Sequence, residues 1–512
     1  FEPLLLADLP ERLDGGSRYR FRLKDGVRFH DNPCFPGGKG REVVADDVFY
    51  SLKRIADRDN GLKNWWLLDD QIVGLEPQPP GETFDYAAPV EGLVKRSDKE
   101  FEIVLNRPVH RFLWVLAMFQ TSVLPREAVE YYGENFSRNP VGTGPFILDS
   151  WAPKQHIHFK RNPNYHECYY PEESKWSAED REAGLHEAAG QRLPMVDRLE
   201  FTMYVPDQPV WLEFQQGKLG YIELPFPFFT EAFSRRSKRM DRELRQKGVT
   251  YRAEPQLDMI FRAFNMDDPL LGGYSEEKIA LRRAITLAID LDEFNETFYE
   301  GLCVHYDGPI PPRMDGHPAE GRAPGAPRGP DIERARAELA RAGYPGGEGL
   351  PPLKFYTSEG GSNQQQTDML RRQLARIDVE LDAQLVDFSQ LSELVNKRQA
   401  PMFGFAWLSD YPDAENNLAL FYSPNASPGS NHWNYSRPEF DEMYKRAIVM
   451  EPGPERTALY EQMRDMVIAD CVIIGSLART RYYLIQPWLK NARPTNTFHA
   501  WFKYLDIDES RR

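Results

Sequence analysis

Alternating apolar and polar residues near the start of the chain predict a half-buried β-strand. Tyr19, Phe21 and Leu23 alternate with basic residues between positions 18 and 27, and Asp25-Gly26 supplies a turn. A helical spacing of apolar residues follows at 45–55, with two acidic residues in its first turn. Together these elements predict a small α/β unit, not one that binds nucleotides.

The second half of the chain alternates between the two periodicities more regularly. A strand is expected at 258–265, followed by the clearest helix of the chain at 275–290, with Ser275 as its N-cap. Beyond them the pattern predicts strands at 353–356, 379–385 and 402–407, helices at 363–377, 388–398, 438–449 and 454–469, and a strand at 472–475. Such alternation indicates a parallel or mixed α/β sheet, whose ligands gather past the carboxyl ends of the strands.

The turn after the predicted strand at 402–407 carries the candidate site. Trp407 ends the strand, and Ser409, Asp410 and Tyr411 follow it directly. A carboxylate flanked by aromatic rings can hold a cation. The alternative is an aspartate that caps a turn, which is the usual role of a single aspartate in such a place, so the rest of the chain has to decide between the two.

Length and charge narrow the class of protein. A chain of 512 residues is too long for one core, which predicts about three domains or lobes. The net charge of −15 leaves no basic face for phosphates, so we expect no nucleic-acid partner. No window approaches 18 uninterrupted apolar residues, so we predict no membrane-spanning segment.

Candidates for metal binding and catalysis are weak. His156 and His158 share one face of a predicted strand, but only His166 and Glu167 stand nearby as further ligands. No nucleophile motif and no His-Glu-x-x-His motif occurs, so we expect no catalytic residue, metal or cofactor. The scattered cysteines exclude a Cys-x-x-Cys motif and leave pairing or a reduced state open: Cys34, Cys168, Cys303 and Cys471.

Three segments break the alternation. Residues 75–95 and 167–193 are polar or rich in Pro and Gly, and we interpret both as surface insertions. Residues 228–247 are predicted as a charged helical face.

Six blocks of sequence occur in a fixed order along nearly the whole chain. They are 19–30 with 45–54, 139–146 with 160–165, 281–290 with Gly301 and 309–312, 335–345, 407–411, and 434–441. Together they resemble the extracellular solute-binding proteins of the peptide/nickel family, family 5, which serve ABC importers.

The resemblance implies an α/β fold of the periplasmic-binding-protein-like type II. Two lobes would be joined by two hinge strands, an extra α/β subdomain would be inserted in the first lobe, and the ligand would be enclosed when the lobes close. Lobe I would comprise 1–17, 139–260 and 477–512, the subdomain 18–138, and lobe II 261–476, with hinges near 258–265 and 471–476.

The resemblance also implies a function and a site. The protein would be a non-catalytic receptor that captures a peptide or related amine-bearing solute and delivers it to an ABC transporter permease. In peptide-binding relatives the aspartate of this stretch meets the ligand ammonium, which implies that role for Asp410, with Trp407 lining a side-chain pocket. The expected ligand-binding set is Trp407, Ser409, Asp410, Tyr411, Trp433, Asn434 and Tyr435.

Other ligands and roles stay open. Dipeptide-binding relatives carry an arginine for the ligand carboxylate after the strand at 353–356, whereas residues 357–366 contain none. An oligosaccharide stacked on Trp407, Trp433 or Tyr435 is therefore the main alternative ligand, although it has no ammonium for Asp410. A ligand-sensing module of a regulator is the alternative role, because the chain begins abruptly at Phe1.

We expect a monomer in the periplasm or another extracytoplasmic space. The family normally has some tens of residues before the block at 19–30, and here about eighteen stand there. A missing N-terminal segment is therefore one route to membrane anchoring.

Overall fold

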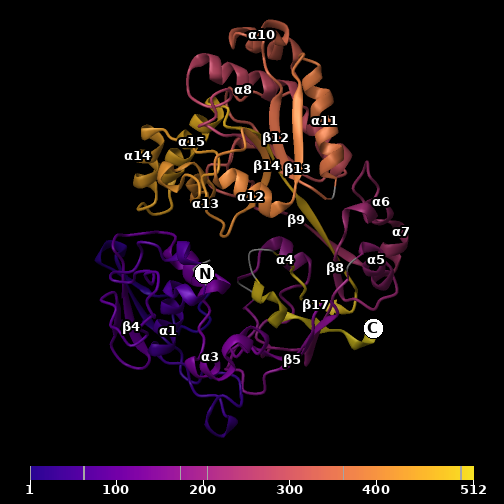
Figure 1. Ribbon diagram of the computed structural model, residues 1–512. Coiled ribbons are helices and arrows are strands. Elements are labelled where there is room, and N and C mark those ends of the chain that lie inside the picture. Colours follow the sequence, from indigo (N-terminus) through magenta and orange to yellow (C-terminus); the bar gives the residue numbers. More distant parts are fainter. Residues whose placement is uncertain (1, 61–63, 173–174, 205, 361, 496–498) are drawn as a thin grey trace. The chain divides into compact units, whose positions relative to one another are not determined.

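The computed structural model of the chain describes residues 2–60, 64–172, 175–204, 206–360, 362–495 and 499–512 (Figure 1). It divides into two compact units. Unit 1 comprises Phe1–Ile222, Gln246–Thr250 and Leu484–Arg512, and unit 2 comprises Glu223–Arg245 and Tyr251–Tyr483. The lobe boundaries and the hinges near 258–265 and 471–476 stay predictions.

The N-terminal part of unit 1 is built on an antiparallel sheet in the order β1-β2-β4-β3. Its strands are β1 (Glu11–Leu13), β2 (Arg18–Arg22), β4 (Glu100–Val104) and β3 (Leu93–Lys95). The inward residues Tyr19 and Phe21 of β2 pack with Phe101 and Phe112, which confirms the predicted alternation. Helices α1 (Ala45–Ala56), α2 (Phe112–Ala117) and α3 (Arg126–Tyr132) accompany the sheet, and α1 confirms the helix predicted at 45–55.

A second antiparallel sheet of unit 1 contains β5 (Phe146–Ala152), β6 (His156–Arg161) and β7 (Arg198–Thr202). The segment 167–193 contains α4 (Ala178–Glu182) and has a small cluster of its own, in which Tyr170 and Leu193 are buried. The segment 75–95 is tied to α1, because Lys53 donates hydrogen bonds to the carbonyls of Tyr86 and Ala88. Remaining elements of unit 1 are α5 (Asp207–Gln215) and the pair β17 (Leu489–Lys490) and β18 (Asp506–Ile507).

The charged helix predicted at 228–247 is wrong. The chain instead forms α6 (Phe229–Ala232) and α7 (Arg242–Gln246), separated by a turn in which the Ser234 amide donates to the Arg239 carbonyl at 2.9 Å. Phe233 and Met240 are both buried and form a bridge across this turn. Burying these two side chains together overrides the helical propensity of the basic residues between them.

A further sheet has three strands in the order β8-β16-β9. Its strands are β8 (Tyr221–Glu223), β16 (Thr480–Ile485) and β9 (Thr250–Pro255).

Unit 2 is organised around a six-stranded mixed sheet in the order β11-β15-β10-β14-β12-β13 (Figure 1). The strands β12 (Leu353–Ser358), β13 (Leu381–Val386) and β14 (Met402–Leu408) run parallel. The strand β10 (Asp258–Phe264) is antiparallel to β14 and to β15 (Ile473–Ala478), and β11 (Val304–Tyr306) forms the edge. The predicted strand-helix alternation of this half of the chain is confirmed.

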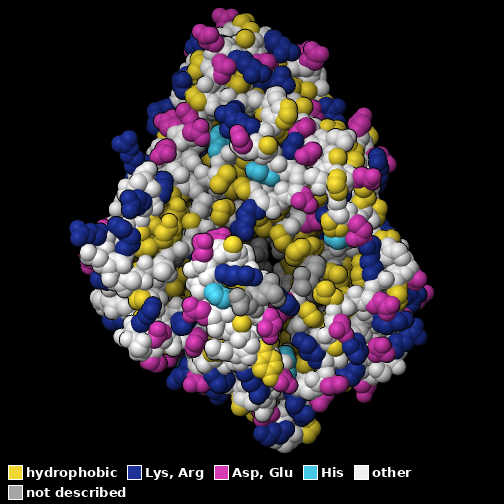
Figure 2. All heavy atoms as spheres, turned by 180° about the vertical axis from the view of Figure 1, so that it is seen from behind, with side chains coloured by type: hydrophobic (Ala, Val, Ile, Leu, Met, Phe, Trp, Pro, Cys, Tyr) yellow, Lys and Arg dark blue, Asp and Glu magenta, His cyan; other side chains and the backbone are white. Residues whose placement is uncertain are grey.

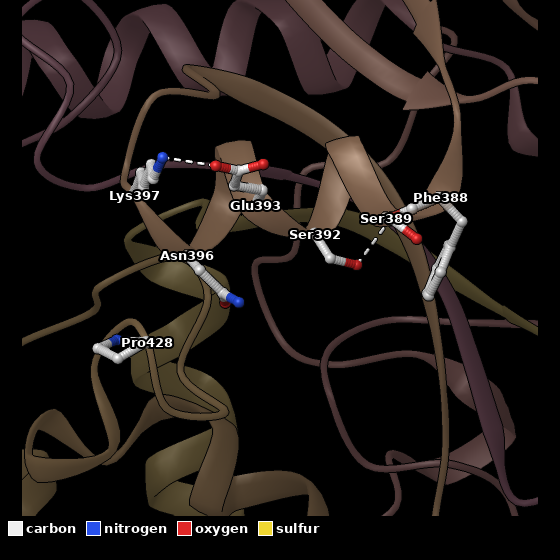
Figure 3. Close-up of a pocket in the computed structure, with 7 residues that line it drawn as sticks. All are labelled: Phe388, Ser389, Ser392, Glu393, Asn396, Lys397 and Pro428. Atoms are coloured by element: carbon white, nitrogen blue, oxygen red, sulfur yellow. Dashed lines mark hydrogen bonds and ion pairs between the residues drawn. The ribbon is translucent and has the colours of Figure 1, made fainter.

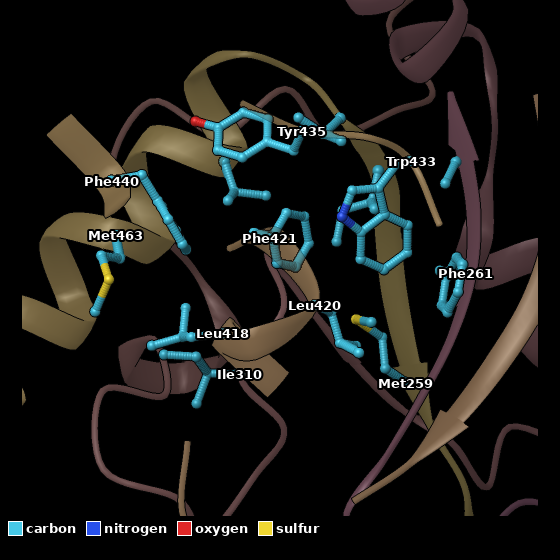
Figure 4. Close-up of a cluster of buried hydrophobic side chains, with 14 of the residues drawn as sticks. Met259, Phe261, Ile310, Leu418, Leu420, Phe421, Trp433, Tyr435, Phe440 and Met463 are labelled. Atoms are coloured by element: carbon cyan, nitrogen blue, oxygen red, sulfur yellow. The ribbon is translucent and has the colours of Figure 1, made fainter. Parts of the chain in front are cut away.

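Two hydrophobic cores cover the two faces of this sheet. Met259, Phe261 and Ala263 of β10 face the first core, which also contains Trp433 and Tyr435 (Figure 4). Its helices include α12 (Phe388–Asn396), α13 (Glu415–Leu418), α14 (Pro438–Ala447) and α15 (Pro454–Ala469). Phe264 faces the second core, with α8 (Glu276–Ala288), α9 (Leu291–Phe298), α10 (Ile332–Arg341) and α11 (Asn363–Ala375). Because side chains alternate along a strand, Arg262 lies on this second face.

Candidate functional site

The turn after β14 brings Trp407 and Asp410 together through one buried amide. Asn416 of α13 accepts hydrogen bonds at its Oδ1 from the Trp407 indole (3.0 Å) and from the Asp410 backbone amide (3.2 Å). Its Nδ2 donates to Asp410 Oδ2 at 3.1 Å. Trp407 is half-buried and Asp410 is exposed, so an exposed carboxylate is held on a fixed frame beside a tryptophan.

Ser409 and Tyr411 point away from solvent. The Ser409 hydroxyl donates to Asn417 Oδ1 at 2.7 Å, and its amide donates to the Leu257 carbonyl at 2.8 Å. The Tyr411 hydroxyl donates to Glu415, and Tyr411 is 2% exposed. These two residues attach the turn to the protein interior, while Trp407 and Asp410 occupy its outer side.

Buried polar side chains next to this turn are paired with one another. We call this group the paired layer, and its members are Asp413, Glu415, Arg456, Tyr411, Tyr444 and Tyr460. Asp413 forms a buried ion pair with Arg456 and accepts a hydrogen bond from Tyr460 at 2.9 Å. Glu415 accepts hydrogen bonds from the hydroxyls of Tyr411 and Tyr444. Burial and the neighbouring Asp413 raise the pKa of Tyr460, so it stays a donor at neutral pH.

The other three predicted site residues are buried. Trp433 stacks on Phe421 with ring centroids 4.5 Å apart and is 1% exposed. The Tyr435 hydroxyl donates to Asp470 at 3.0 Å, and Asn434 Nδ2 donates to Asn265 at 3.0 Å. Trp433 and Tyr435 belong to the first core of unit 2, and Asn434 is hydrogen-bonded beside it. That any of the three contacts a ligand stays a prediction.

The structure adds a surface that the sequence did not indicate. A depression of about 660 Å³ lies along α12, directly after the carboxyl end of β13 (Figure 3). Phe388 is 66% exposed at one end of it, with its ring 5.8 Å from that of Phe405 on β14. The lining residues are Phe388, Ser389, Ser392, Glu393, Asn396, Lys397 and Pro428. The depression can take an apolar group at Phe388 and polar groups along the helix.

The histidines that stood out in the sequence form part of unit 1. The rings of His156 and His158 stack at 4.2 Å, and His158 Nδ1 lies 3.2 Å from the Ser150 hydroxyl. Burial lowers the pKa of His166 to about 4, so it is neutral at pH 7. Among the described residues, no group of three or more His, Cys, Asp or Glu side chains is placed to hold a metal ion. All four cysteines are free thiols, and Cys303 and Cys471 are buried.

The surface charge agrees with the composition. On the face shown in Figure 2, Lys and Arg side chains are interspersed with Asp and Glu. Within the part of the chain that the structure describes, no helix is long and apolar enough to cross a membrane.

Comparisons with known proteins place the chain in a family. The profile of the bacterial extracellular solute-binding proteins, family 5 Middle, matches residues 1–429. The chain is 25% identical over 466 residues to a probable di/tripeptide-binding protein 5 of Pseudomonas aeruginosa, covering 89% of this chain and 77% of that protein. It is 24% identical over 472 residues to heme-binding protein A of Haemophilus influenzae, covering 90% and 76%.

A solved structure shares the fold over nearly the full length. It is the ABC transporter-associated periplasmic binding protein DppA from Helicobacter pylori in complex with the peptide STSA. The TM-score is 0.72 at 20% sequence identity, covering 99% of this chain and 90% of that one. The chain therefore belongs to the family 5 bacterial extracellular solute-binding proteins, non-catalytic binding proteins of ABC transport.

Proposed function

We propose that this protein binds a peptide or related amine-bearing solute and delivers it to the permease of an ABC transporter. The observation that carries the proposal is the exposed Asp410 carboxylate, which Asn416 fixes beside Trp407 at the carboxyl end of β14. A carboxylate in that place can pair with a ligand ammonium, and the neighbouring ring can line the space for a side chain.

The frame around Asp410 is suited to binding because it is already ordered. The Asn416 side chain is buried, with the residue 4% exposed. The backbone N–H of Asn416 donates to the backbone carbonyl of Asp413 at 3.0 Å. The paired layer fixes α13 through Glu415, which accepts hydrogen bonds from Tyr411 and Tyr444. Asn416 and Asp410 therefore lose little conformational entropy when a ligand binds. The bond from Asn416 fixes the orientation of the Asp410 carboxylate, while Asp410 itself stays exposed to solvent.

The burial of two aromatic candidates favours a peptide over a sugar. A stacked oligosaccharide needs exposed rings, whereas Trp433 and Tyr435 are 1% and 0% exposed. Only Trp407 of the three rings reaches the surface. The family includes relatives named for peptides and for heme. The proposal of a peptide ligand therefore rests on Asp410 and not on sequence similarity to these relatives.

The remaining parts of the proposal concern setting and assembly. We propose that the protein acts as a monomer in the periplasm or another extracytoplasmic space. The use of the same fold as the sensing module of a regulator is the second candidate for its role.

Calorimetric titration with short peptides and their N-acetylated forms tests the role of Asp410. Wild-type protein should prefer the free amine, and Asp410→Asn should weaken that binding by about 10- to 100-fold while leaving binding of the acetylated form unchanged. Asp368→Asn, which removes another exposed carboxylate of unit 2, is the control. Equal affinity of Asp410→Asn and wild type for the free amine contradicts the proposal.

A further inference from the structure

Arg262 is a buried cation without a compensating carboxylate. It lies in the middle of β10 and is 7% exposed. Its guanidinium donates to Gln366 Oε1 at 3.2 Å and lies over the Phe294 ring, 4.1 Å from the centroid. Among the described residues, no Asp or Glu oxygen lies within 4.0 Å of it. Among the described residues its neighbours are the neutral Gln366 amide, the Phe294 ring face and the Tyr299 hydroxyl.

Other buried arginines of unit 2 show what complete pairing looks like. Arg282 donates to the carbonyls of Leu271, Gly273 and Asp470, twice to the last. Arg456 pairs with Asp413, and Arg464 binds Asp465 and the Gly316 carbonyl. Each of these guanidinium groups meets a charge or several carbonyls, so each is explained by the fold alone.

A second positive charge faces Arg262. Gln366 belongs to the first turn of α11, a helix of 13 residues whose first turn contains no acidic side chain. Its N-cap residue Ser362 makes no capping hydrogen bond with its side chain. The positive end of the helix dipole therefore adjoins the guanidinium. Burial lowers the pKa of Arg262 to about 10, which still leaves it charged at neutral pH.

The neighbours of Arg262 in the sheet leave its guanidinium beside the start of α11. It pairs in register with Gly404 of β14, so no side chain from that strand covers it. The neighbouring strand β12 ends at Ser358, and the loop from β12 leads directly into α11. Arg262 is thus level with the start of β14, and its guanidinium reaches the first turn of α11, which follows the carboxyl end of β12.

We propose that Arg262 and the first turn of α11 form a subsite for a carboxylate group of the ligand. The subsite deepens the proposed function and rests on it, because it makes the solute one that carries a carboxylate as well as an amine. The carboxylate would take two hydrogen bonds from the guanidinium fork and lie at the helix N-terminus. Tyr299, half-buried and within hydrogen-bonding reach of Gln366, is placed to contact it as well.

The first test needs no known ligand. Thermal unfolding of the full chain is compared in acetate and in chloride at equal ionic strength, for wild type, Arg262→Met and Arg371→Met. Arg371 is an exposed arginine of α11 that pairs with Asp368, so its variant removes a charge from the same helix without touching the subsite. Acetate should raise the Tm of wild type and of Arg371→Met and leave that of Arg262→Met unchanged. An equal shift in all three proteins, or no shift in any, overturns the subsite.

The second test uses peptides whose carboxylates are free or fully amidated. Wild type should bind the free form about 10- to 100-fold more tightly, Arg262→Met should bind both forms alike, and Arg262→Lys should recover part of the difference. If wild type binds the two forms equally, the subsite is wrong. If wild type binds neither form, the proposed peptide function fails, while the acetate comparison still decides whether Arg262 holds a carboxylate.

Discussion

Two buried polar regions of unit 2 differ in how their charges are compensated. In the paired layer beneath the Asp410 turn, Asp413 meets Arg456, and Glu415 receives two tyrosine hydroxyls. Around Arg262, a buried guanidinium meets a neutral amide, a ring face, the Tyr299 hydroxyl and the positive end of α11. The first region is complete within the protein, whereas the second lacks an anion.

The contrast separates polar groups that support the fold from groups available for binding. Removing one partner of a buried ion pair leaves an uncompensated charge and costs about 3–5 kcal/mol. Removing a buried charge that has no partner releases the cost of its desolvation instead. The same type of substitution should therefore change the free energy of unfolding in opposite directions in the two regions.

The largest effect is expected from Arg456→Met. It leaves the Asp413 carboxylate buried with two neutral donors, the Tyr460 hydroxyl and the Glu415 backbone amide, and no counter-charge from Arg456, so the free energy of unfolding should fall by about 3–5 kcal/mol. Urea unfolding followed by circular dichroism measures it. Arg371→Met, at an exposed pair, should change stability by less than about 0.5 kcal/mol. If Arg456→Met lowers the free energy of unfolding no more than Arg371→Met does, the paired layer does not stabilise the fold.

An intermediate effect is expected from Tyr444→Phe. The change removes one of the two hydroxyls that donate to Glu415 and should lower the free energy of unfolding by about 1–2 kcal/mol. Tyr422→Phe is the matched control, because the Tyr422 ring stacks on Tyr444 at 4.5 Å and its hydroxyl makes no hydrogen bond with any residue that the structure describes. If the free energy of unfolding falls equally in both variants, the packing of the two rings, and not the hydrogen bond to Glu415, accounts for the change.

Arg262→Met should have a smaller effect of the opposite sign. Methionine keeps the contact with Phe294 and removes the buried charge, so the free energy of unfolding without ligand should stay within about 0.5 kcal/mol or rise by about 1 kcal/mol. The measurement is the same urea titration. A loss comparable to that of Arg456→Met would mean that Arg262 supports the fold, and the contrast between the two regions would disappear.

The fold was largely predictable because its elements are decided locally. Ser275 does cap α8, accepting a hydrogen bond from the Lys278 amide at 3.4 Å, and the strands and helices from β12 to β14 follow the predicted order. The periods of apolar residues fix such elements without knowledge of their neighbours. The prediction failed at 228–247, where the buried contact of Phe233 with Met240 decides the structure.

The site was predictable only where neighbours in sequence are neighbours in space. Trp407 and Asp410 are adjacent because one turn contains them, but the role of Asn416 depends on how α13 folds back. A search for an arginine within 357–366 could not find Arg262, which reaches Gln366 from a strand 104 positions earlier in the chain. Nor does the sequence around the start of the block at 434–441 reveal that Trp433 and Tyr435 face a core.

The smallest effect concerns a buried group that stays neutral, His432. Within the described part of the chain its Nδ1 has no hydrogen-bond partner, and burial lowers the pKa of the imidazole below its ordinary value of about 6.5. As the pH falls below about 6.5, the unfolded chain takes up a proton that the folded protein does not, so stability falls toward the lower, folded pKa. His432→Phe keeps the edge contact with Phe405 and should flatten the urea-unfolding profile between pH 6.5 and 5. An unchanged profile would mean that other histidines cause the pH dependence and that the burial of His432 does not reduce stability at low pH.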